Sequence, residues 1–153
     1  MRTHRPTEAG AALVELAVAF PLLALLIVGT TDFARAFYTG IELINAARAA
    51  AQYGAQDLSH SADTATMQTI ARTAGDLPGV TAVASRSCRC ASDDGVAIGG
   101  AVSCTTSCTG GQHLITTVTV DATSSFSINS ALRLAGVPRT FQIQRSATLR
   151  VPD

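Results

Sequence analysis

The chain contains no lysine and no tryptophan, and aromatic residues make up only 5% of its 153 residues. The absence of lysine excludes the glycine-rich phosphate loop that ends in lysine and binds nucleotides. The scarcity of aromatic residues limits the hydrophobic core that a domain of this size can build. A folded part of the chain therefore gains more than usual from disulfide bonds.

The chain also lacks an excess of charge of either sign. Its formal net charge at pH 7 is zero, and charged residues account for only 14% of the sequence. Proteins that bind nucleic acid normally carry a basic surface. The charge balance therefore predicts that the chain has no nucleic-acid partner.

Residue patterns that support catalysis are missing as well. No Gly-x-Ser-x-Gly nucleophile motif occurs. The histidines are far apart in the sequence and lack the partners of a general base: His4, His60 and His113. Asp93-Asp94-Gly95 predicts a turn, because two carboxylates are too few to hold calcium. We therefore predict that the chain is not an enzyme and uses no cofactor.

A long uncharged run occupies the N-terminal part of the chain. No charged residue occurs from Leu16 to Gly29, and the wider window Ala9–Thr31 contains Glu15 as its only charge. About 20 apolar residues are enough to cross the hydrocarbon core of a bilayer. We therefore predict a transmembrane segment at residues 11–31. An ionisable group in such a segment is costly, so Glu15 is a candidate functional residue.

The carboxylate of Glu15 has two interpretations. If the chain is cut after Gly10, Ala11 becomes a free ammonium one helical turn from Glu15, on the same side of the helix. Opposite charges attract strongly in a medium of low dielectric, although desolvation removes much of the gain. Alternatively, Glu15 lies in the headgroup layer and reaches out to water.

The residues that flank the run predict its orientation. Arg2 and Arg5 precede the run, whereas Asp32 and Arg35 after it nearly cancel. Basic flanking residues remain on the cytoplasmic side of a membrane. Residues 1–10 are therefore predicted to be a cytoplasmic leader, with the remainder of the chain on the opposite side.

Helical periodicity continues past the apolar run. We predict one helix from Ala11 to about Asp57, which is roughly 70 Å long at 1.5 Å per residue. Residues 32–57 form its amphipathic extension. The apolar positions of this extension are Phe33, Phe37, Ile41, Ile44, Ala47 and Ala51, and its polar positions are Asp32, Arg35, Glu42, Asn45, Arg48 and Gln52. Pro21 predicts a kink near Phe20–Pro21, although membrane helices also tolerate proline without a special purpose.

Residues 58–153 are predicted to form a small α+β domain. After a loop at Leu58–Asp63, a short helix begins at a cap on Ser61 or Asp63 and ends at Gly75. Its inner face contains Met67, Ile70, Ala71 and Ala74. The period then changes to two, which predicts strands at Val80–Arg86, Gln112–Asp121 and Thr140–Val151, with connections at Thr123–Ser130 and Gly136–Pro138. The fold class is therefore a long N-terminal helix packed with a short helix and a small antiparallel sheet.

The four cysteines flank an insert at residues 88–108 and allow three disulfide pairings. A local bridge between Cys88 and Cys90 is sterically poor. In a hairpin, residues two apart share a face of the strand, which favours the nested pairing Cys88–Cys108 with Cys90–Cys104. The crossed pairing is the alternative. Each bridge adds about 2–4 kcal/mol of stability.

Zinc is the other interpretation of the cysteines. Four thiolates, with His113 nearby, resemble a zinc ligand set. However, zinc knuckles place two to four residues between paired cysteines, whereas a single residue separates Cys88 from Cys90. Export also favours oxidation. We therefore predict disulfides and no metal.

The N-terminal motifs as a set resemble the TadE-like pseudopilins, which are minor subunits of the Tad (Flp) branch of type IV pili. The motifs are Gly10, Val14-Glu15, Leu16-Ala17, Pro21, Asp32-Phe33, Arg35, Tyr38, Asn45-Ala46-Ala47-Arg48 and Gln52-Tyr53-Gly54-Ala55. The resemblance is dense over residues 8–55. It is looser beyond, where the paired cysteines, a Val/Thr strand and Ser146–Pro152 are also similar to the family. Leu16 stands where many members have phenylalanine.

The resemblance implies a pilin-like fold and a pathway of processing and assembly. Gly10 would mark the cut by a prepilin peptidase, with Ala11 as the new N-terminus, and Glu15 would match the glutamate that the family needs for processing or assembly. The implied partners are the prepilin peptidase, other pilins and pseudopilins, the assembly platform with its ATPase motor, and the lipid bilayer. The subunit would span the bacterial inner membrane once, with a periplasmic C-terminal domain, before it joins or supports a pilus that acts in adhesion or secretion.

Two alternatives place the chain in another functional class. Leu16–Val28 is similar to a signal-peptide core, and Ala34-Arg35-Ala36 to a cleavage pattern, which together would release a disulfide-bonded binding domain that starts at Phe37. The charge of Glu15 argues against this secreted form. An uncleaved signal anchor that displays a ligand or zinc module explains the topology but leaves Gly10 and Glu15 without a role.

Overall fold

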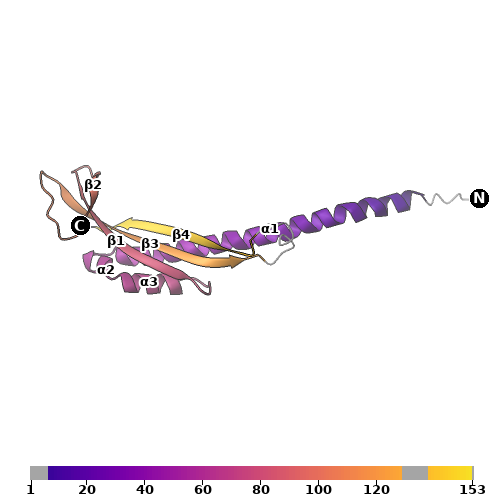
Figure 1. The fold of residues 1–153 in the computed structure, drawn as a ribbon, viewed down its shortest axis with the longest axis horizontal. Helices are drawn as coiled ribbons and strands as arrows, with labels where there is room; N and C mark the ends of the chain where they lie inside the picture. Colours follow the sequence, from indigo (N-terminus) through magenta and orange to yellow (C-terminus); the bar gives the residue numbers. More distant parts are fainter. Residues whose placement is uncertain (1–6, 129–137, 153) are drawn as a thin grey trace, which may run out of the picture. The chain divides into compact units, whose positions relative to one another are not determined.

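The structure is a computed structural model, and it describes residues 7–128 and 138–152. The elements are α1 (Thr7–Gly54), α2 (Leu58–Ala62), α3 (Thr64–Thr73), β1 (Thr81–Ala91), β2 (Ala97–Val102), β3 (His113–Ser127) and β4 (Thr140–Arg150) (Figure 1). This α+β architecture confirms the predicted fold class. The chain divides into two compact units, Met1–Phe37 with Ser127–Thr140 and Tyr38–Phe126 with Phe141–Asp153, which we call the first and the second unit.

The first unit contains the apolar part of α1. All side chains from Ala11 to Phe20 are exposed, including large apolar ones. An exposed helix that is apolar on all sides is suited to lipid. Within residues 7–128 and 138–152, α1 is the one helix that is long and apolar enough to cross a membrane. It continues through Pro21 without a break, and the kink near that residue stays a prediction.

The second unit contains a four-stranded antiparallel sheet with the order β2-β1-β3-β4. Strand β1 pairs with β3 from Thr81 opposite Thr123 to Ala91 opposite His113. The N–H of Val151 donates to the carbonyl of Thr116 over 2.9 Å and continues the pairing of β3 with the end of β4. Buried residues alternate with exposed ones along much of β1 and with mostly half-buried ones along β3. One face of the sheet is therefore covered and the other faces solvent.

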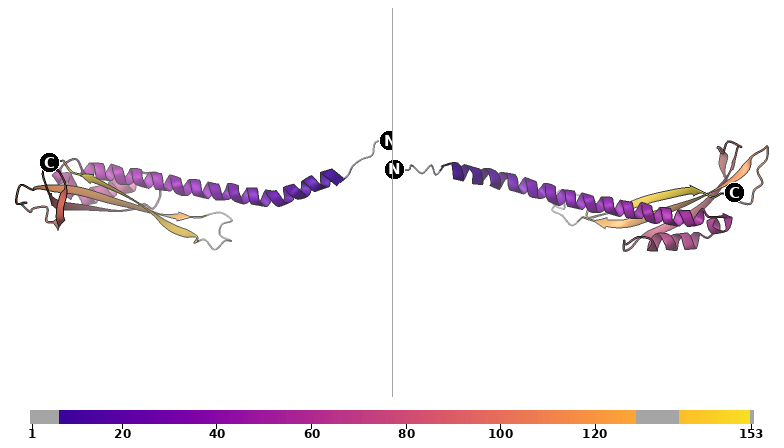
Figure 2. Two further views of the ribbon diagram at one scale, coloured as in Figure 1. Left: turned by 90° about the horizontal axis from the view of Figure 1, so that it is seen from above. Right: turned by 180° about the vertical axis from the view of Figure 1, so that it is seen from behind.

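Helices of the second unit cover the buried face of this sheet. The C-terminal part of α1 and α3 lie next to each other beside the strands (Figures 1 and 2), and α3 packs on β1. The helical core residues are mostly small: Leu43, Ala46, Ala47, Ala50, Ala51, Met67 and Ala71. The strands contribute Ala82, Ala84, Val118, Val120, Ala122, Ile143 and Ala147, and Val151 follows directly after β4. A core rich in alanine agrees with the scarcity of aromatic residues and lets the backbones approach closely.

The closest of these approaches occurs at Gly54, where α1 ends. A Cβ atom at this position would collide with Sδ of Met67 and would lie 3.3 Å from Cγ1 of Val118. Met67 and Val118 are both fully buried. Gly54 therefore lets the end of α1 meet α3 and β3 without a gap.

The predicted apolar face of the helix extension is only partly correct. Ala47 and Ala51 are buried as expected, but Phe33, Phe37 and Ile41 are exposed. The physical reason is the size of the side chains. The sheet packs on the alanine-rich side of α1, which permits close contact, and the bulky side chains remain outside.

Two further segments differ from the prediction. Leu58–Asp63 was expected to be a loop but forms α2, because Asp57 accepts a hydrogen bond from the N–H of His60 and caps a short helix. The cysteine insert contains an additional strand, β2, whose uncharged residues lack a polar–apolar alternation. The predicted helix after Asp63 is confirmed as α3, although Ala74 is its exposed C-cap and does not face the core.

The strand limits are partly as predicted. β1 and β3 extend beyond the predicted ends, so that Thr123–Ser127 belongs to β3 and not to a connection. The turn at Asp93–Gly95 is confirmed, and Gly95 adopts a φ of 76° that favours glycine. The remainder of the predicted connection, at residues 129–137, and His4 lie outside the described residues.

Candidate functional site

The predicted processing site lies in the first turns of α1. Gly10, Ala11 and Glu15 are all exposed, and a Cβ atom at Gly10 would have no neighbour within 4 Å. Residues four apart face the same side of a helix, so Glu15 lies one turn from Ala11. In the part of the chain that the structure describes, Glu15 forms no hydrogen bond or ion pair. Its carboxylate is thus accessible to a charged partner.

The far end of the apolar segment carries a buried carboxylate. Asp32, expected on the polar face of the helix, is only 7% exposed. Nη1 of Arg35 lies 3.1 Å from Oδ1 of Asp32, one helical turn away. Pairing with an opposite charge offsets part of the cost of burying a carboxylate. Asp32 and Arg35, the charged residues that follow the apolar segment, therefore form an ion pair within α1.

Four polar side chains link the three helices of the second unit. The hydroxyl of Tyr53, near the end of α1, donates to Oδ2 of Asp63 over 3.2 Å. Oδ1 of Asp63 accepts the N–H of Thr66 over 3.0 Å and caps α3. Nδ1 of His60 lies 2.7 Å from Oδ2 of Asp57, and the His60 ring meets the Tyr53 ring edge-on at 4.7 Å. The network fixes the turn through which the chain leaves α1.

These contacts shift three pKa values. The hydroxyl of Ser59 and the N–H of His60 hold the pKa of Asp57 well below its ordinary range. The hydroxyl and the N–H of Thr66 lower the pKa of Asp63. Burial, together with the bond to Asp63, raises the pKa of Tyr53. Both carboxylates are therefore stabilised in their charged form by hydrogen bonds that form only in the folded chain.

Acid is expected to destabilise the second unit through these two carboxylates. Because their folded pKa values are lowered, the stability that they contribute is complete above the unfolded value of about 3.9 and is lost as the pH falls through the folded values. We expect the melting temperature to fall as the pH drops below about 4. The Asp57→Asn/Asp63→Asn variant should show a shallower fall, because asparagine still caps a helix but does not titrate.

Thermal unfolding followed by circular dichroism measures this difference. Asp63→Ala serves as the control that removes the cap at every pH, so its melting temperature should be lower at pH 7 as well. The same pH slope in the wild type and in the double asparagine variant would contradict the prediction.

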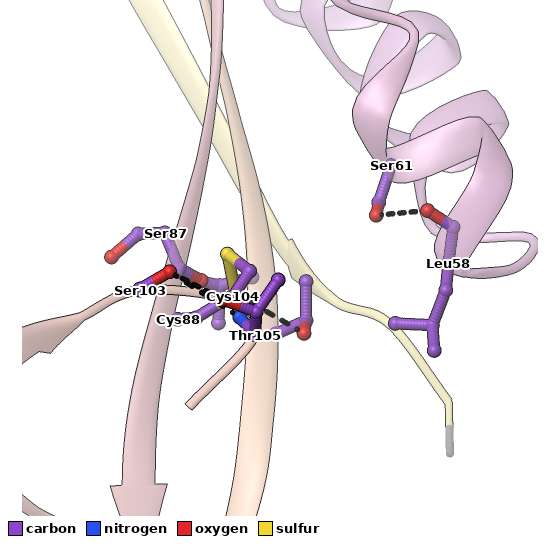
Figure 3. The surroundings of a disulfide bond; sticks show 9 residues. Leu58, Ser61, Ser87, Cys88, Ser103, Cys104 and Thr105 are labelled. Atoms are coloured by element: carbon purple, nitrogen blue, oxygen red, sulfur yellow. Dashed lines mark hydrogen bonds between the residues drawn. A yellow bond between two sulfur atoms is a disulfide. The ribbon is translucent and has the colours of Figure 1, made fainter. Parts of the chain in front are cut away.

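The cysteines form two disulfides, Cys88–Cys104 and Cys90–Cys108. This is the crossed pairing, so the favoured nested pairing, Cys88–Cys108 with Cys90–Cys104, is wrong. No cysteine is free, which leaves no thiolate for zinc. Figure 3 shows the first bridge between β1 and the segment that follows β2, beside Ser103 and Thr105. The Cys88 side chain is buried, and its Sγ lies 3.4 Å from the Thr116 hydroxyl.

The position of β1 between β2 and β3 explains the crossed pairing. On one side, Cys88 is opposite Val102, so the chain places Cys104 near Cys88 as it leaves β2. On the other side, Cys90 is opposite Leu114, near the start of β3, so Cys108 approaches Cys90 before β3 begins. The nested prediction assumed a plain hairpin, but the second cysteine pair lies in the segment between β2 and β3.

Residues 10–52 match the family model described as TadE-like protein. The chain is TadE-like over this segment. The match begins at Gly10, contains Glu15 and lies entirely within α1, which confirms the resemblance noted from the sequence for these residues. No curated protein and no solved structure matches the chain.

The TadE-like match covers the apolar part of α1 and most of the helix beyond it. The exposed apolar part of α1 is suited to a single membrane anchor. The residues at the start of the match therefore form the best candidate site in the chain.

Proposed function

We propose that the chain is a minor pseudopilin of a Tad pilus. The N-terminal part of α1 anchors it in the bacterial inner membrane, with the N-terminus in the cytoplasm and the second unit in the periplasm. The TadE-like match over residues 10–52 is the observation that carries this proposal. The disulfides of the second unit support it, since such bonds form in the oxidising periplasm.

In this proposal a prepilin peptidase cuts the chain between Gly10 and Ala11. Gly10 is exposed and has no side chain to hinder a peptidase. Glycine also destabilises a helix by about 1 kcal/mol relative to alanine. The backbone therefore unwinds more readily at Gly10 than at the alanines beside it, and an unwound peptide bond is accessible to cleavage.

Cleavage then gives Glu15 a counter-charge. The new ammonium of Ala11 lies one helical turn from Glu15, which has no partner of its own among the described residues. From Ala11 to Thr31, Glu15 is the only charged residue. Its carboxylate pairs with this ammonium or with that of a neighbouring subunit, and either pairing lowers the cost of keeping both charges in the membrane. The mature subunit is thereby made ready for assembly with other pilins.

Intact mass and N-terminal sequencing of the chain from native membranes test the proposal. The wild type should begin at Ala11, because cleavage follows Gly10. Glu15→Gln should insert normally, but its incorporation into pili should fall by about tenfold, which corresponds to a loss of about 1.4 kcal/mol of charge pairing. Immunoblots of sheared pili and of membranes measure this ratio.

Glu42→Gln provides the matched control, because Glu42 lies on the same helix beyond the apolar segment and should leave the ratio unchanged. A chain that begins at Phe37 would support secretion, and an intact Met1 would support a signal anchor. Normal pili in Glu15→Gln would exclude the charge-pairing role.

A further inference from the structure

The two disulfides cross each other in the sequence. Each bridge joins one cysteine of β1, Cys88 or Cys90, to one cysteine of the segment between β2 and β3, Cys104 or Cys108. Each cysteine of β1 therefore has two candidate partners in that segment, and only one of them is the native partner.

Loop closure in the unfolded chain does not distinguish the crossed from the nested pairing. Cys88 and Cys90 are two positions apart, so exchanging their partners shortens one loop by two residues and lengthens the other by two. The native loops have sequence separations of 16 and 18 residues. Because the entropy of closure depends on the logarithm of loop length, the unfolded chain is expected to form the two pairings in a ratio of about 1:1.

The hairpin of β1 and β2 also specifies the pairing weakly. Strand β2 is uncharged, contains Gly99 and Gly100, and is exposed along almost its whole length. Its register with β1 is irregular between Cys88 and Cys90. Strands rich in glycine are prone to slip in register, and an isolated two-stranded hairpin is only marginally stable. A slip of two residues would place Cys104 beside Cys90 instead of Cys88.

Strand β3 supplies the register that this hairpin lacks. It pairs with β1 from Thr81 to Ala91, the full length of β1. Cys88 is buried beside Thr116 of β3. However, β3 begins at His113, after the last of the four cysteines. A chain that enters an oxidising compartment with β1 first therefore exposes all four thiols before the strand that selects their partners.

We infer that the chain is a substrate of a thiol–disulfide isomerase, which converts the nested pairing into the crossed one. The inference rests on the proposed function only in placing the second unit in an oxidising compartment. A disulfide oxidant of that compartment supplies the bridges, and it is reduced to two thiols for each bridge formed. The isomerase then changes the pairing without changing the number of disulfides.

The conversion consists of three thiol–disulfide exchanges. The isomerase thiolate attacks Sγ of Cys108, forms a mixed disulfide and releases the Cys88 thiolate. The Cys88 thiolate attacks Sγ of Cys104, forms the native bridge Cys88–Cys104 and releases the Cys90 thiolate. The Cys90 thiolate attacks Sγ of Cys108 in the mixed disulfide, which completes the second bridge and releases the isomerase thiolate.

The burial of the cysteines gives this exchange a direction. Cys104 and Cys108 are only half-buried and enclose the exposed residues 105–107, so an external thiolate has access to their sulfur atoms. Cys88 is only 1% exposed once it lies against β3. Reopening the native bridge would release a thiolate at Cys88 inside the core, which burial disfavours. The crossed form therefore accumulates.

One substitution makes the pairing readable from peptide masses. Ser107→Arg, at an exposed position, adds a tryptic site between Cys104 and Cys108. Trypsin also separates Cys88 from Cys90, because it cuts after Arg89. The crossed pairing then holds three peptides together in one species. The nested pairing gives a pair of linked peptides and a separate looped peptide, residues 90–107.

The first test uses the full Ser107→Arg chain in detergent. The chain is oxidised with oxidised glutathione in denaturant and then refolded without free thiol, and we expect the two pairings at about 1:1. Adding a purified bacterial disulfide isomerase should raise the ratio of crossed to nested chains at least about tenfold, because only the crossed form permits the packing of Cys88. The same isomerase with its nucleophilic cysteine replaced by serine should leave the ratio unchanged.

The second test compares bacteria with and without a periplasmic disulfide isomerase. Without the isomerase, about half of the Ser107→Arg chains should carry the nested pairing. Cys90→Ala/Cys108→Ala is the matched control, because its two remaining cysteines can pair in only one way. Its oxidation to Cys88–Cys104 should be the same in both hosts.

Three outcomes would overturn the inference. Crossed pairing alone after oxidation in denaturant would show that the unfolded chain already selects its partners. Crossed pairing alone in the host without the isomerase would show that folding precedes oxidation. A nested form that persists with active isomerase would show that the crossed form is not favoured. The test in detergent needs neither peptidase nor pilus, so it stays valid if the proposed function fails. Four free thiols in the chain from native membranes would instead contradict the periplasmic location.

Discussion

Removing the disulfide Cys88–Cys104 is expected to lower the free energy of unfolding of the second unit by about 3 kcal/mol. The bridge closes a loop with a sequence separation of 16 residues, and its loss increases the conformational freedom of the unfolded chain. Cys88 is also part of the core beside Thr116. The variant is Cys88→Ala/Cys104→Ala, and denaturant unfolding in detergent followed by circular dichroism measures the change.

The variant Cys90→Ala/Cys108→Ala is the matched control. Its loop has a similar separation of 18 residues, but both of its cysteines are only half-buried. The part of the destabilisation that comes from loop closure should therefore be similar to that of the first variant. The part that comes from lost packing should be smaller. An equal or larger destabilisation in this control would contradict the role assigned to Cys88 in the core.

The pairing itself is checked by a single substitution. In Cys104→Ala, the crossed pairing leaves Cys88 as the free thiol, whereas the nested pairing would leave Cys90 free. Trypsin cuts after Arg86 and Arg89 and so separates the two cysteines into different peptides. Alkylation before digestion should thus label the peptide Ser87–Arg89.

The second large effect is expected at Gly54. Gly54→Leu should destabilise the second unit by about 3 kcal/mol, the upper part of the usual range for overpacked cores. Even a Cβ atom at this position collides with Met67 and lies 3.3 Å from Val118, so a leucine forces α1 away from α3 and β3. Denaturant unfolding in detergent measures the loss.

Two further variants separate crowding from a general effect of leucine. Gly29→Leu is the control, because a Cβ atom there has no neighbour within 4 Å, and it should cause little change. In Gly54→Leu/Met67→Ala the smaller side chain leaves room for the leucine, so the double variant should lose less stability than the two single changes added together. Simple additivity would show that Met67 is not the source of the strain.

Periodicity in the sequence predicts the helices and strands whose apolar residues recur at a clear spacing. The change from a helical to a two-residue period located α3 and three strands, and the length of the apolar run predicted the apolar part of α1. The N-cap of α3 at Asp63 was also expected, as one of two candidates, because a carboxylate before a helical pattern satisfies a free backbone N–H.

Other features depend on contacts that periodicity does not contain. Phe33 and Ile41 fit an apolar helical stripe equally well whether the stripe meets a sheet or lipid, so the sequence could not decide which side of α1 would be buried. The hydrogen bond between Tyr53 and Asp63 joins two helices across a turn. Local sequence signals existed only for the N-cap positions of Asp57 and Asp63, which precede α2 and α3.

The disulfide pairing was missed for a topological reason. A hairpin brings only two strands together, whereas β1 has neighbours on both sides. Cys88 therefore pairs with a cysteine that follows β2, on one side of β1. Cys90 pairs with a cysteine that precedes β3, on the other side. The candidate processing site stays a prediction, and it needs no long-range contact because Gly10, Ala11 and Glu15 lie in the first turns of one helix.

The two bridges from β1 also determine how the protein withstands cleavage by proteases. The segment between Cys90 and Cys104 contains the exposed turn after β1 and the exposed strand β2, which makes it a natural target for such enzymes. A cut anywhere in that segment leaves two covalent links between the fragments, through Cys88–Cys104 and Cys90–Cys108. A nicked subunit would therefore keep β3 and β4 attached to α1, and the most exposed part of the second unit can be damaged without releasing the rest.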